Sequence, residues 1–105
     1  MGLSMNNLTY ALKEEFLRVS KLLTKEYGYY PSRFLQDLEN EGTIPTVKKL
    51  VMSDKLHEGF VKLWELGRLD LTVEAIILKD PYNQLFCPEI LEKARTRLQQ
   101  MGYEV

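Results

Sequence analysis

The most informative stretch of this chain is residues 59–78, GFVKLWELGRLDLTVEAIIL. Its first part has the apolar spacing of an amphipathic helix, a charged corner follows at residues 67–70, and residues 71–78 are apolar on nearly every side. A helix that is apolar all round has to be buried among other elements. We therefore expect residues 71–78 to form the central helix of an all-α core.

A β-strand is the alternative for residues 71–78, because β-branched side chains are frequent there. The sequence offers no second strand-like run, and a buried strand without a neighbour would leave its backbone groups unpaired. We therefore favour the helix. Asp70 or Thr72 would cap its start, where Glu74 also suits the positive end of the helix dipole.

A long first helix is predicted by an apolar stripe, spaced by three and four residues, that runs from Leu8 to Tyr27. Asn6 or Asn7 can cap its start by accepting a hydrogen bond from a free backbone N–H. Gly28 ends it, because glycine enters the left-handed backbone region without steric cost.

Four more helices follow from the same spacing and from proline and glycine signals. They are expected in residues 31–41, 43–52, 55–66 and 88–101. Aromatic residues at helical spacing, Trp64 among them, are expected in the core. The six helices would form a single domain over residues 1–105, a compact array or bundle.

The charge balance argues against a dedicated nucleic-acid binder. The chain has 14 basic and 15 acidic residues in 105, whereas binding to a phosphate backbone favours a clear basic excess. A domain of this length can bury a core without a metal or a disulfide to hold it.

The expected location is the cytoplasm. Cys87 is the single cysteine, so no intrachain disulfide can form. The first residues lack the basic and apolar regions of a secretory signal, and no segment approaches the ~20 apolar residues of a membrane span. We expect no association with a membrane.

Catalytic or metal-binding groups are sparse. His57 is the single histidine, and Glu58 beside it points about 100° away on a helix, so the two cannot converge on one ion. Cys87 precedes Pro88 at a helix start, which can lower a thiol pKa, but a buried apolar role is more common. We expect no catalytic residue, no cofactor and no metal.

Several aromatic and basic residues lie at helix ends or in turns instead of on apolar stripes. Tyrosine combines an apolar ring with a polar tip, which suits protein interfaces. The leading interpretation is an interaction or regulatory domain that binds a protein partner, possibly a second copy. Its candidate surface is Tyr29, Tyr30, Arg33, Arg68, Tyr82 and Phe86. Arg68 is also expected to pair with Asp70 or Glu74 and to fix the corner.

Two other classes stay open. Residues 31–52 resemble a helix-turn-helix, although Leu38 stands where a small residue is usual. An accessory nucleic-acid-binding role would use Lys48, Lys49, Arg95 and Arg97. An enzyme of unknown type would require a deep pocket around Cys87 or His57.

The chain resembles a family of small, uncharacterised all-helical bacterial domains over roughly residues 26–103. The likeness is carried by nine short motifs. They are YGY at 27–29, RFL at 33–35, GF at 59–60, LW at 63–64, GRLDLTVE at 67–74, LF at 85–86, AR at 94–95, RL at 97–98 and GY at 102–103. The family often has paired glycines where this chain has EGT at 41–43. Some members of the family lie near restriction or other DNA-handling genes. The resemblance therefore implies a role connected with nucleic acids. It implies no catalytic residue.

Overall fold

The computed structural model describes residues 5–105, which are helical with no strand among them. The predicted all-α fold is therefore confirmed. The elements are α1 (Met5–Tyr27), α2 (Ser32–Glu41), α3 (Thr43–Met52), α4 (Glu58–Glu65), η1 (Leu69–Leu71), α5 (Val73–Ile77), η2 (Tyr82–Leu85) and α6 (Pro88–Gln100).

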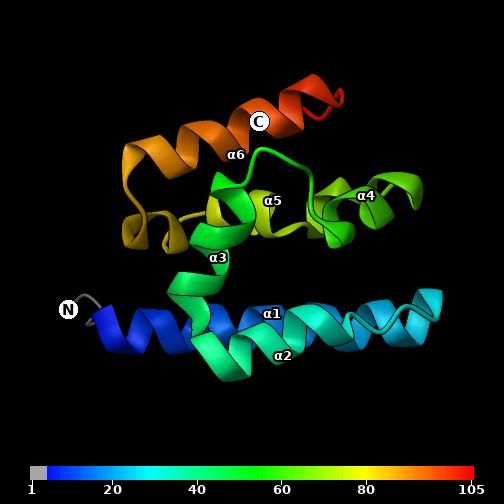
Figure 1. The fold of residues 1–105 in the computed structure, drawn as a ribbon, viewed down its shortest axis with the longest axis horizontal. Helices are drawn as coiled ribbons and strands as arrows, with labels where there is room; N and C mark the ends of the chain where they lie inside the picture. The colour runs from blue at the N-terminus through cyan, green and yellow to red at the C-terminus, as the bar shows by residue number, and fades with distance from the viewer. Residues whose placement is uncertain (1–4) are drawn as a thin grey trace.

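The helices lie in three tiers (Figure 1). α1 and α2 run alongside each other at one side, α6 lies at the opposite side, and α4, α5 and η2 lie between them. α3 crosses from the α1–α2 tier toward α6 and contacts both α1 and α6. This arrangement places the middle tier between helices on two sides.

The short helix α5 is the buried centre of the fold. All five of its residues are buried, and Thr72 before it is fully buried. The Thr72 hydroxyl accepts a hydrogen bond from the Ala75 N–H at 3.1 Å, which is the predicted cap. The helix is shorter than the predicted residues 71–78, because the chain first forms the 3₁₀ turn η1 and Leu78 already ends α5.

Two predicted details at the helix starts are wrong. Asn6 and Asn7 lie inside α1, so neither can be its N-cap. Pro31, which the predicted range 31–41 places inside the second helix, is the residue before α2. The predicted ends hold, since Gly28 and Gly42 adopt φ values of +65° and +92° directly after α1 and α2.

The predicted burial of Trp64 is also wrong, because its side chain is 48% exposed. α4 has only eight residues and buries Phe60 and Leu63. Leu56, at 39% exposed, precedes the helix. So short a helix presents one narrow face to its neighbours, and side chains beside that face reach solvent.

The corner between α4 and α5 is fixed as expected by Arg68. Its guanidinium donates two hydrogen bonds of 3.0 Å to the Asp70 carboxylate and one of 2.8 Å to the Tyr27 hydroxyl. The hydrogen bonds from Arg68 hold the pKa of Asp70 below its usual value. The pair links the corner to the end of α1.

Replacing Asp70 with Asn is expected to lower the free energy of unfolding at pH 7 by less than about 1 kcal/mol, because both partners are partly exposed. A carboxyl whose pKa is lower in the folded chain stabilises the fold above its unfolded pKa and loses that effect as pH falls. Urea unfolding should therefore show the two proteins converging below about pH 4. A difference that is the same at pH 7 and pH 2.5 would contradict an ionic origin.

Among residues 5–105, no helix has both the length and the apolar character that crossing a bilayer requires.

Candidate functional site

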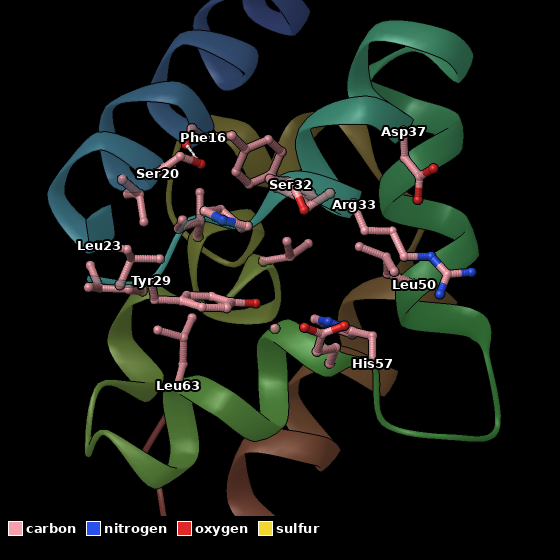
Figure 2. A pocket seen from close by; sticks show the side chains of 18 of the residues that line it. Phe16, Ser20, Leu23, Tyr29, Ser32, Arg33, Asp37, Leu50, His57 and Leu63 are labelled. Atoms are coloured by element: carbon pink, nitrogen blue, oxygen red, sulfur yellow. Dashed lines mark hydrogen bonds between the residues drawn. The ribbon is translucent and has the colours of Figure 1, made fainter. Parts of the chain in front are cut away.

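A pocket of about 540 Å³ opens between the α1–α2 tier and the middle tier of the fold. Figure 2 shows Phe16, Ser20 and Leu23 of α1 on one side of it and Leu63 and His57 on another. Most of the wall is apolar. The apolar side chains that line it are Phe16, Val19, Leu23, Pro31, Phe34, Leu50, Leu56, Leu63, Leu71, Val73 and Ile76.

Polar side chains gather at the open side of the pocket. Asp37 is neutralised by Lys49, whose ammonium lies 3.1 Å from its carboxylate. Arg33, Lys55 and Glu58 also line the pocket, are exposed, and take part in none of the ion pairs among residues 5–105. The pocket thus has an apolar interior and charged groups that are free to meet a ligand.

Tyr29 forms one wall of the pocket with its ring, and its hydroxyl points into the hollow (Figure 2). Burial, followed by the nearby negative charge of Glu58, raises the pKa of the Tyr29 phenol above its usual value. The ammonium group of Lys62, a residue of α4, lies 5.9 Å from the centroid of the Tyr29 ring. The hydroxyl therefore stays protonated at neutral pH and can donate a hydrogen bond to a ligand.

His57 connects the pocket to a buried ion cluster, which we call the triad: His57, Glu74 and Arg97. The Glu74 carboxylate is fully buried. It lies 3.0 Å from His57 Nε2 through each of its oxygens and 3.1 Å from Arg97 Nη1. Arg97 also donates hydrogen bonds to the carbonyl oxygens of Leu50 and Ser53. The triad joins α3, α4, α5 and α6.

The protonation of His57 follows from its partners. Its Nδ1 accepts the Phe60 N–H at 3.2 Å and so caps α4, which leaves the proton on Nε2 to be donated to Glu74. With this neutral tautomer, the Glu74 and Arg97 charges cancel. Both ring nitrogens are occupied, so neither is available to a molecule in the pocket.

Sequence reasoning missed the triad. It placed Glu74 at the positive end of a helix dipole and offered Arg97 as a nucleic-acid contact, yet both are buried and paired with each other. The three residues are far apart in the sequence: Glu74 follows His57 by 17 positions and precedes Arg97 by 23. No local spacing pattern can therefore reveal that they are partners. The available signal was a carboxylate inside an apolar helix, which demands a buried partner.

The six residues of the predicted interaction surface do not form one patch. Tyr29, Tyr30 and Arg33 lie together on the pocket wall. Arg68 is at the α4–α5 corner, bound to Asp70 and Tyr27. Tyr82 packs against the core. Phe86 is only 7% exposed and belongs to the core, because the turn after η2 folds it inward, so it is not available to a partner.

The four predicted nucleic-acid contacts are also dispersed. Lys49 pairs with Asp37 and Glu41, and Arg95 pairs with Glu92 at 2.8 Å. Arg97 is buried in the triad, so its guanidinium cannot reach a phosphate. Lys48 is exposed on α3.

Cys87 is exposed, contrary to the buried role that we favoured, because it is the residue that precedes α6 at its N-cap position. It does not line the pocket. Within residues 5–105, no three histidine, cysteine or acidic side chains lie close enough together to hold a metal ion.

Comparisons with protein-family models, curated proteins and solved structures found no match for this chain. The family resemblance therefore stays a prediction.

Proposed function

We propose that this chain is a binding module whose pocket takes a small, largely apolar molecule. The supporting observation is the pocket itself. Its volume of about 540 Å³ falls within the roughly 300–1,000 Å³ of small-molecule sites, which combine an apolar wall with a few polar groups. Tyr29 and Arg33 supply such groups beside the apolar wall.

Binding is favoured over catalysis by the state of His57. A general base needs a nitrogen within hydrogen-bond reach of the substrate. His57 could free a nitrogen only by giving up the cap of α4 or the bond to Glu74. We therefore assign the triad a structural role: it holds one wall of the pocket in place.

Binding can be tested with a neutral apolar dye, N-phenyl-1-naphthylamine, whose fluorescence rises in apolar surroundings. We expect saturable binding to the native chain. Ser20→Leu should weaken it at least tenfold, since Ser20 is buried on the pocket wall and leucine adds volume there. The lost hydroxyl bond is local, because Ser20 donates only to the Phe16 carbonyl of the same helix.

Ser20→Ala is the matched control, because it removes the same hydroxyl without filling the pocket. It should bind the dye as the native chain does. Circular dichroism and thermal unfolding would show that both variants remain folded. Equal affinity in all three proteins, or no saturable binding to the native chain, would overturn the proposal.

A protein partner is the second candidate occupant, favoured by Tyr30, which is 62% exposed on the pocket rim. Native mass spectrometry of the chain purified at low salt separates the two candidates. An added mass of a few hundred daltons that is absent from Ser20→Leu would support a small molecule. A bound polypeptide, or a dimer that Ser20→Leu disrupts, would instead favour a protein partner.

Binding of DNA or RNA is a separate prediction with a separate measurement. It requires affinity that falls with salt, by about one unit of log–log slope for each phosphate contact. Because Lys48 is exposed, Lys48→Gln should lower that slope. A salt-independent response, or no complex at low salt, would exclude it.

A further inference from the structure

A second hollow, of about 570 Å³, lies on the next face of α1, where that helix meets the start of α2. We call it the basic groove. Its floor is apolar, with Leu17 from α1 and Leu35 from α2. Ser20 and Tyr30 line both this groove and the pocket described above. The two hollows therefore meet along the edge that these two side chains form.

The basic groove carries an excess of positive charge. Its charged side chains are Arg18, Lys21, Lys25 and Glu14, three basic and one acidic. Arg18 is paired with Glu15 at 2.8 Å. Lys21 and Lys25 are exposed and belong to none of the ion pairs found among residues 5–105.

Lys21 and Lys25 are suited to hold one anion together. Residues four apart on a helix lie on the same face, about 5–6 Å between their β-carbons. Like charges at that spacing repel each other weakly, and an anion bound by both ammonium groups would remove this repulsion. The long lysine stems also cover apolar surface while the charged ends stay in water. The groove thus combines a cationic rim with an apolar floor.

We propose that the ligand of this chain is an amphiphilic anion. Its apolar body fills the pocket, and its carboxylate or phosphate head reaches past Ser20 and Tyr30 to Lys21 and Lys25. Tyr30 is 62% exposed, so its ring can turn aside without disturbing the core. This inference rests on the proposed function, because it identifies the chemical class of the molecule that the pocket binds.

Charge complementarity selects this occupant over the alternatives. Lys21 and Lys25 would repel a cationic head and would gain nothing from a neutral one. An acidic peptide would satisfy the lysines but would leave the apolar pocket empty. An anionic lipid bilayer could bind the exposed lysines. However, an apolar chain could enter the pocket only if one lipid molecule left the bilayer.

The experiment is displacement of N-phenyl-1-naphthylamine by four molecules with the same ten-carbon chain, each below its micelle-forming concentration. They are decanoate, decyl phosphate, decanol and decyltrimethylammonium. We expect the two anions to bind about tenfold more tightly than decanol, which corresponds to ~1.4 kcal/mol. The cation should bind most weakly. The preference for anions should shrink as salt is added, because exposed charges are screened.

Substitutions locate the head group. Lys21→Gln together with Lys25→Gln should remove most of the preference of decanoate over decanol, while decanol keeps its affinity. Lys48→Gln is the control, since it removes an exposed lysine on α3 that lines neither hollow. It should leave the preference unchanged.

The outcomes separate this inference from the proposed function. If neither the dye nor any decyl compound binds, the proposed function itself fails. If decanol and decanoate bind equally, or the double lysine variant keeps the preference, only the amphiphilic anion is overturned. Displacement by hexaglutamate at the same concentration as decanoate would overturn it in favour of an acidic peptide. Binding to anionic vesicles without binding to monomeric decanoate would overturn it in favour of a lipid surface.

Discussion

Arg97→Met is expected to lower the free energy of unfolding by about 3–5 kcal/mol, the cost of breaking a buried ion pair by removing one partner. Methionine keeps much of the length and volume of arginine but leaves the fully buried Glu74 carboxylate without its countercharge. It also removes the donors to the carbonyl oxygens of Leu50 and Ser53. Urea unfolding followed by circular dichroism would measure the loss.

The control is the double variant Glu74→Leu with Arg97→Met. An apolar replacement of a buried ion pair is often neutral or stabilising, so this protein should recover the part of the loss that comes from the unpaired Glu74 charge. The rest should remain, because His57 Nε2 and the Leu50 and Ser53 carbonyl oxygens still lack their partners. The difference between the double variant and the sum of the two single variants gives the coupling between the two side chains. Additive losses would contradict a paired role for Arg97 and Glu74.

Ile77→Ala is expected to cost about 2–5 kcal/mol, the usual range for truncating a large aliphatic side chain in a packed core. Ile77 is fully buried in α5, which contacts α6, α3, η1 and η2. The cavity left behind would therefore be walled by several elements that cannot all move inward. Because domains of this size are stable by roughly 5–15 kcal/mol in total, the midpoint of thermal unfolding should fall steeply.

Trp64→Ala is the comparison for Ile77→Ala. It removes a larger side chain, but one that is 48% exposed at the end of α4. We expect a loss below about 1 kcal/mol, as is typical of surface substitutions. A larger loss from Trp64→Ala than from Ile77→Ala would contradict the placement of α5 at the centre of the core.

Local patterns in the sequence predicted most of the helices. The three-and-four spacing of apolar residues identified α1 to α4 and α6, and Gly28 and Gly42 end α1 and α2 as expected. The Thr72 cap and the Arg68–Asp70 ion pair could also be predicted from the local sequence, because each joins residues only two or three positions apart. These features depend on neighbours along the chain.

The candidate site could not be predicted in the same way. Glu74 and Arg97 become partners only when α6 is laid against α5. A carboxylate inside an apolar helix indicates that Glu74 needs a buried partner, but nothing in the sequence identifies Arg97 as that partner. The pocket is a gap left between tiers of helices, so its position depends on how every wall packs. Tyr29, Tyr30 and Arg33 were singled out because they lie in or beside a turn, but what they surround became visible only in three dimensions.

The triad also has a consequence for the synthesis of the chain. Its acidic member is made 23 residues before the guanidinium that neutralises it. Until Arg97 has left the ribosome, burial of the Glu74 carboxylate would carry the full free-energy cost of burying an unpaired charge. We therefore expect the nascent chain to keep this segment hydrated and to complete its interior in one cooperative step, once the last helix has emerged.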